Sequence, residues 1–138
     1  MRIALTTTLL LLFAGVSHAD TLSKLKQDLA FYEKAASSDK STIDRNKKQI
    51  RMINESRNKQ IARVKKTISA KALKGLRHSA REAKKKSARE KIKRIEANAM
   101  NRKKNPSRQI KKAEESWRKN RSKVRDLKYK IAKLESKQ

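Results

Sequence analysis

Cysteine is absent from the 138 residues, which excludes disulfide bonds as a source of stability. Small exported proteins often depend on such bonds, because a short chain can build only a small hydrophobic core. Any ordered structure of this chain must therefore come from helix packing, from self-association or from a bound partner.

Glycine, proline and aromatic residues are scarce as well. The chain has two glycines and one proline, and aromatic residues make up 4% of it. So few aromatic side chains cannot fill a compact globular core, and so few helix breakers leave long uninterrupted stretches. We therefore predict an all-α fold of long basic helices, of coiled-coil or helical-hairpin type. Disorder in the free state is the alternative, because high net charge and low hydrophobicity oppose folding.

Residue types that carry catalysis or bind metals are also few. The histidines are His18 and His78, and His78 lies between Arg77 and Arg81, where a solvent-exposed role is the simplest interpretation. The sequence contains neither a Cys/His cluster with metal-ligand spacing nor a glycine-rich phosphate loop. We predict a non-enzymatic protein without a metal ion or cofactor.

The N-terminal residues have the three-part pattern of a secretory signal. Arg2 supplies the positive charge, residues 3–16 form an apolar run, and Ser17-His18-Ala19 places small residues where a signal peptidase cleaves. The run is shorter than the roughly 20 residues that a membrane-spanning helix needs. We predict a cleaved signal peptide over residues 1–19 and a periplasmic or extracellular location. The alternative is an uncleaved N-terminal anchor on an envelope-spanning rod.

Hydrophobic spacing divides the remaining chain into three predicted helices. The first is a short amphipathic helix over residues 20–36, in which apolar residues recur at alternating steps of three and four. The polar residues 37–41 predict a turn, although the same spacing reaches Ile43 and would also suit a continuous helix. The second is a long basic helix over residues 42–104, in which Ile50, Ile61 and Ala72 repeat at eleven residues.

The third predicted helix is an amphipathic coiled-coil helix over residues 107–138. It follows Pro106, which disfavours helix in the residue before it. Residues with heptad spacing are expected to mediate assembly into a homo-oligomer, and Asn120 among them would select the register. These residues are Ile110, Trp117, Asn120, Val124, Leu127, Ile131 and Leu134. An equally good alternative is a helix that packs within its own chain.

Positive charge is concentrated in the long second helix. Residues 45–104 contain 23 Lys and Arg against four Glu, a net charge of +19, while residues 20–44 have −1 and residues 105–138 have +8. The densest run contains Arg81, Lys84, Lys85, Lys86, Arg89, Lys91, Lys93 and Arg94. Repulsion between like charges on one helix would be relieved by a polyanion, which would also release counterions.

These features predict an exported helical protein that binds a polyanion or an anionic membrane surface through its basic middle segment. Envelope polymers, lipid headgroups and nucleic acid are the candidate partners. The alternative is a periplasmic holdase-type chaperone, whose clients would be acidic or unfolded envelope proteins.

Overall fold

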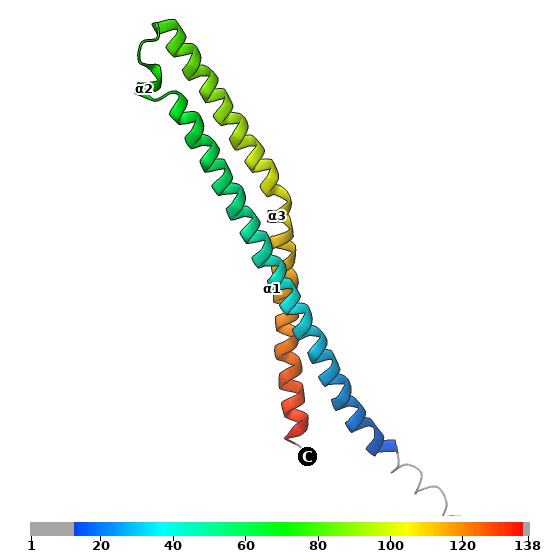
Figure 1. The fold of residues 1–138 in the computed structure, drawn as a ribbon. Coiled ribbons are helices and arrows are strands. Elements are labelled where there is room, and N and C mark those ends of the chain that lie inside the picture. The colour runs from blue at the N-terminus through cyan, green and yellow to red at the C-terminus, as the bar shows by residue number, and fades with distance from the viewer. Residues whose placement is uncertain (1–12, 137–138) are drawn as a thin grey trace, which may run out of the picture. The chain divides into compact units, whose positions relative to one another are not determined.

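A computed structural model describes residues 13–136 of the chain, with side chains from Asp20 onward. Helix α1 spans Phe13–Thr67, α2 spans Ala70–Leu73 and α3 spans His78–Glu135 (Figure 1). No strand occurs between residues 13 and 136, which confirms the predicted all-α fold.

The described helices contain no apolar stretch that is long enough to span a bilayer. Residues 1–12 of the predicted signal sequence lie outside the described residues, and residues 13–19 belong to α1.

The chain divides into two units. The first comprises the chain up to Lys40 and from Glu114 onward, and the second comprises Ser41–Ala113. Each unit therefore contains a stretch of α1 and a stretch of α3.

In the first unit, α1 and α3 run antiparallel. Lys26 Nζ lies 2.9 Å from Glu135 Oε1, and Lys128 Nζ lies 2.9 Å from Glu33 Oε1. As the residue number rises along α1, the residue number of the partner on α3 falls, so the two helices run in opposite directions. The core consists of Leu127 and Ile131, which are buried, together with half-buried residues such as Leu29.

In the second unit, the stretches of α1 and α3 lie side by side and are joined through α2 (Figure 1). Lys103 Nζ donates to Asn54 Oδ1 across the pair at 3.1 Å. The seam combines branched side chains on α1 with alanines on α3. The buried hydrophobic side chains are Ile43, Ile53, Leu73, Ala88, Ala99 and Ala113, and Asn46 and Pro106 are buried as well. Large residues opposite small ones let the two helices approach closely.

The turn predicted at residues 37–41 is helix in the structure. Neither glycine nor proline occurs there, so only serine and aspartate oppose the helix, and they do so weakly. Two residues farther on, Ile43 is buried in the second unit. Its burial anchors α1 in the second unit directly after the polar run.

The chain reverses within the segment that was predicted as one helix over residues 42–104. Helix α1 ends at Thr67, and Ser69 caps α2 by accepting a hydrogen bond from the Ala72 amide at 3.3 Å. Gly75 then takes a φ of +83°, a conformation that glycine adopts without steric cost. These features correct the prediction of a continuous helix.

Pro106 lies inside α3, which corrects the prediction that a helix ends at this proline. A proline in a helix interior removes one backbone hydrogen bond and costs about 3 kcal/mol relative to alanine. Here its ring is buried in the second unit. Burial of the ring recovers part of this cost, and the long stretches of helix on both sides keep α3 continuous through the proline.

Candidate polyanion-binding surface

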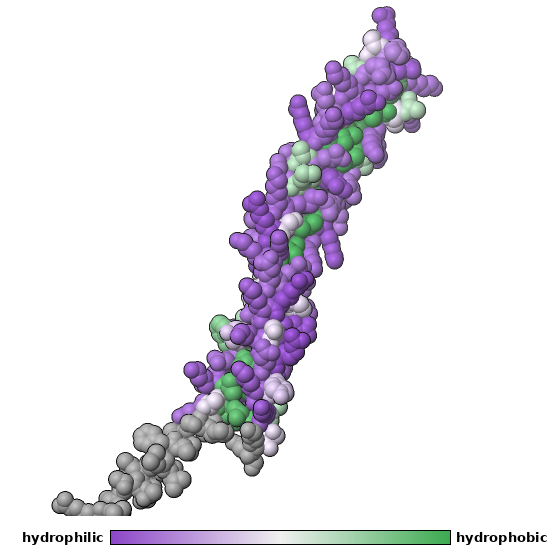
Figure 2. Space-filling view, turned by 180° about the vertical axis from the view of Figure 1, so that it is seen from behind, coloured by the Kyte–Doolittle hydropathy of each residue, from purple (hydrophilic) through white to green (hydrophobic). Residues whose placement is uncertain are grey.

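The second unit carries most of the charge of the chain. Residues 41–113 contain 26 Lys and Arg against five Asp and Glu, a net charge of +21 out of +27. By contrast, residues 20–40 and 114–138 contain 13 basic and eight acidic residues, a net of +5. On the face that Figure 2 shows, hydrophilic residues predominate and hydrophobic ones form short patches between them.

The eight basic residues predicted from the densest run lie together on the first turns of α3. All are exposed except Lys85, which is half-buried. They are Arg81, Lys84, Lys85, Lys86, Arg89, Lys91, Lys93 and Arg94. Because they follow one another on a single helix, the helical geometry alone brings them close together.

Two residues of this cluster have partners within the chain. Arg81 Nε donates to the Leu76 carbonyl at 2.8 Å, which ties the start of α3 to the turn before it. Lys85 Nζ lies 2.8 Å from Glu82 Oε1. The hydrogen bond from Lys85, followed by its charge, lowers the pKa of the Glu82 carboxyl, so that Glu82 is ionised at neutral pH.

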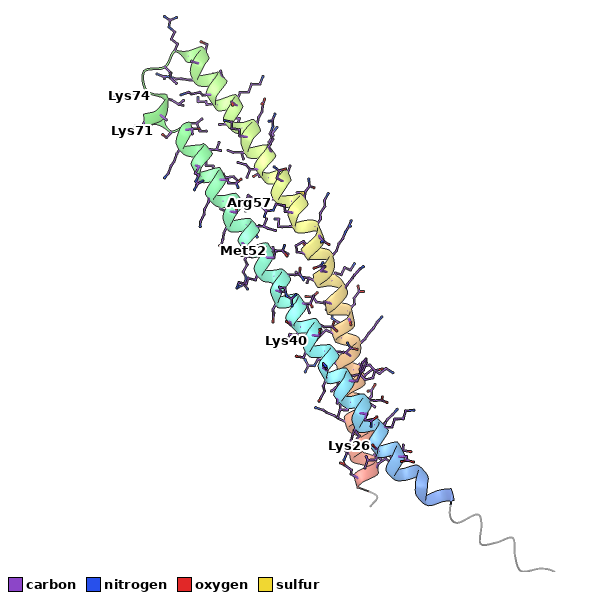
Figure 3. All side chains as sticks on the ribbon, turned by 45° about the vertical axis from the view of Figure 1, so that its right-hand side comes forward. Lys26, Lys40, Met52, Arg57, Lys71 and Lys74 are labelled. Carbon is purple, nitrogen blue, oxygen red and sulfur yellow. The ribbon has the colours of Figure 1, made fainter. Side chains whose placement is uncertain are left out.

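The structure adds a second basic region at the end of the hairpin. Residues 56–81 form the last turns of α1, α2 and the start of α3, and they contain nine basic residues and no acidic one. Lys71 and Lys74 lie at this end in Figure 3. The others are Arg57, Lys59, Arg63, Lys65, Lys66, Arg77 and Arg81. The sequence-based prediction missed this region because it chose the run with the most closely spaced basic residues. It did not consider that residues 56–81 contain no carboxylate to oppose their positive charge.

A groove crosses the second unit between α1 and α3, with a volume of about 390 Å³. Residues at matching helical spacing line it on both sides. Those on α1 are Ile53, Ser56, Arg57 and Gln60, and those on α3 are Ile95, Asn98, Ala99, Asn101 and Arg102. None is acidic. The sequence carried a signal for the groove in the spacing of three, four and seven on each helix, but it did not show which residues face each other.

The residues predicted to mediate assembly contribute to packing within the chain. Leu127 and Ile131 are buried in the first unit, and the remaining five are half-buried. Those five are Ile110, Trp117, Asn120, Val124 and Leu134. Ile110 belongs to the second unit and the other six to the first. The C-terminal stretch of α3 thus packs against residues 26–40 of α1, while self-association through it stays a prediction.

Trp117 has a basic environment. The guanidinium carbon of Arg121 lies 5.0 Å from the centre of its ring, a cation–π distance. A groove beside it is lined from α1 by Glu33, Ala36, Ser37 and Lys40 and from α3 by Trp117, Arg121 and Val124. This groove contains a carboxylate, unlike the one in the second unit.

Within the described residues, no group of three or more His, Cys, Asp or Glu side chains could hold a metal ion. Comparisons with protein-family models, with curated proteins and with solved structures gave no match to this chain.

Proposed function

We propose that this chain is an exported, non-enzymatic helical protein that binds polyanions through its second unit. The observation that supports the proposal most directly is the net charge of +21 on residues 41–113. Most of these basic side chains are exposed. A solvated surface alone is a poor explanation for so large an excess of one sign, because self-repulsion destabilises a folded chain.

A polyanion would relieve this repulsion. Each phosphate, sulfate or carboxylate that contacts a basic side chain offsets repulsion along the helices and releases bound counterions. The carboxylate-free end at residues 56–81 would hold the partner without an opposing charge. Binding should therefore weaken steeply with salt and should raise the stability of the second unit.

The test is titration of the protein with heparin at several salt concentrations. Charge reversal at Lys84, Lys86 and Arg89 to Glu should weaken binding and lower the salt slope, because fewer counterions are released. The matched control reverses Lys34, Lys119 and Lys130, which are exposed residues of the first unit. Equal losses in the two variants, or no binding by the unaltered protein, would contradict the proposal.

The export part of this proposal rests on the signal-like pattern of residues 1–19. Mass spectrometry of the protein recovered from the medium or the cell envelope tests it. Removal of 19 residues is the expected result, and an intact N-terminus would favour an anchored protein instead.

A holdase-type chaperone is the second candidate, and exposed apolar side chains favour it. Phe31 is 67% exposed and Tyr129 is 70% exposed in the first unit, and Met52 and Met100 are exposed in the second. Flexible methionines and aromatic rings adapt to varied apolar clients. Suppression of client aggregation at stoichiometric ratios, persisting at high salt, would support this function over polyanion binding.

A further inference from the structure

The groove of the second unit combines two kinds of polar group above an apolar floor. Arg57 and Arg102 supply a guanidinium from each helix, and Gln60, Asn98 and Asn101 supply carboxamides. Ile53 and Ala99 are buried beneath them. Figure 3 labels Arg57 on α1. The volume of about 390 Å³ falls within the range of small-molecule sites and is sufficient for a monosaccharide with its substituents.

The arginines are suited to phosphate. A guanidinium is planar and always charged, and it donates two parallel hydrogen bonds to a phosphate group. The carboxamide oxygen of Asn58 accepts from Arg57 Nε at 3.1 Å and from Arg57 Nη2 at 2.9 Å, so the Nε–Nη2 edge of this guanidinium is occupied and its Nη1–Nη2 edge is the one left for a phosphate. Arg102 forms no such bond within the described part of the chain and is available to a ligand.

The carboxamides are suited to hydroxyl groups. Each side-chain amide both donates and accepts, as does a sugar hydroxyl, so the two pair in either sense. Gln60 Nε2 donates to Ser56 Oγ at 3.4 Å, a long bond that a ligand hydroxyl could replace. The apolar floor of Ile53, Ile95 and Ala99 offers a surface for the carbon-bound hydrogens of a sugar ring.

We infer that this groove binds a phosphorylated saccharide unit, such as a repeating unit of an anionic envelope polymer or glycolipid. The inference deepens the proposed polyanion binding and rests on it. A nucleic-acid strand suits the groove less well, because single strands are held by base stacking on aromatic side chains. No Phe, Trp or Tyr lines this groove, and residues 41–113 contain none.

The grooves of the first unit lack this combination. One contains the carboxylate of Glu33, which would repel a phosphate. Another is lined by α3 alone, and its Lys128 is already paired with Glu33 at 2.9 Å. Neither is lined by a carboxamide, and each offers a ligand hydroxyl a single serine, Ser122 in one and Ser37 in the other.

The first test is NMR titration of the protein with glucose 1,6-bisphosphate. We expect shifts confined to the amides of residues 53–60 and 95–102. Replacement of Arg57 and Arg102 by Gln should weaken binding at least about tenfold, because charge-assisted hydrogen bonds are lost. The control replaces Arg51 and Arg108 by Gln, which removes the same charge from exposed positions of the same unit outside the groove.

A second variant tests the saccharide contacts without altering the charge. Replacement of Asn98 and Asn101 by Ala should weaken binding of glucose 1,6-bisphosphate while leaving pyrophosphate binding unchanged. Both residues are exposed on α3, and alanine favours a helix, so the fold should persist. Circular dichroism checks this. Equal losses for the two ligands would overturn the saccharide assignment.

The remaining outcomes separate this inference from the proposed function. If the protein binds heparin but shows no localised shifts with glucose 1,6-bisphosphate, the groove assignment fails and polyanion binding stands. Equal losses in the Arg57/Arg102 and Arg51/Arg108 variants would mean that the positive charge of the whole unit attracts the ligand. The groove assignment would then fail as well, and polyanion binding would stand. Tighter, Arg57-dependent binding of an oligothymidylate would assign the groove to nucleic acid. If the protein binds neither heparin nor any phosphate ligand, both proposals fail.

Discussion

Asn120 of α3 donates a hydrogen bond from Nδ2 to Asp39 Oδ2 of α1, at 2.9 Å across the first unit. Both side chains are half-buried in the seam between the helices. Asn120 Nδ2 also lies 3.4 Å from Ser116 Oγ. A polar pair among apolar neighbours favours one alignment of the helices, because a shifted register would leave both groups without a partner.

Replacement of Asn120 by Ala should lower the free energy of unfolding by about 1–2 kcal/mol, because Asp39 loses its partner in a half-buried position. Urea unfolding followed by circular dichroism measures the effect. The control is Asn120→Ala combined with Asp39→Ala. The double variant should be less destabilised than the two single effects added together. Additive effects would show that the hydrogen bond contributes nothing.

The turn before α3 should be sensitive to substitution of Gly75. Its φ of +83° strains any residue with a Cβ, although no atom lies within 4 Å of the place where that Cβ would be. Gly75→Ala should therefore lower the free energy of unfolding by about 1–2 kcal/mol through backbone strain alone. Gly75→Asn should cost less, because asparagine tolerates this conformation better. Equal costs for the two variants, measured by urea unfolding, would contradict this explanation.

Pro106 should be replaceable with a gain in stability. Pro106→Ala restores a donor for the i−4 carbonyl of α3 and removes the clash of the ring, but it loses buried packing. The helix penalty of proline, about 3 kcal/mol, exceeds the roughly 1–2 kcal/mol expected from burial of a small ring, so thermal stability should rise. Thermal unfolding measures the change. A fall in the melting temperature would mean that packing of the ring outweighs the helix penalty.

The sequence predicted the helical fold correctly but misplaced the helix ends. Hydrophobic spacing and composition are local properties, and they were sufficient to predict that the fold is all-α. The reversal at residues 68–77 was missed because Gly75 lies eleven residues after Val64 and could be interpreted as part of the hydrophobic stripe. Pro106 was taken as a helix end because its burial against a second helix depends on tertiary packing.

The candidate site likewise has a part that follows from local sequence and a part that depends on tertiary packing. The cluster from Arg81 to Arg94 was found from sequence because its members are neighbours on one helix. The groove was not found, because Arg57 and Arg102 are brought together only by the position of the turn between α1 and α3. A turn shifted by a few residues would pair different side chains across the seam.

Glu82→Gln should strengthen polyanion binding. The substitution removes one of the five carboxylates of the second unit and frees Lys85, which lies 2.8 Å from Glu82. We expect a roughly two- to threefold higher affinity for heparin at neutral pH and a salt slope steeper by about one ion.

The advantage of the Glu82→Gln variant should depend on pH. Lys85 lowers the pKa of Glu82, so the carboxylate stays charged as the pH falls through the usual range of glutamate. The difference in heparin affinity between the variant and the unaltered protein should persist in that range. It should vanish only when the pH falls through the lowered pKa, where Glu82 becomes neutral. The ion pair with Lys85 would be lost in the same range. The control makes the same Glu82→Gln comparison in a Lys85→Gln background, which removes the ion pair. If the advantage is lost at the same pH in both backgrounds, Lys85 does not govern the ionisation of Glu82.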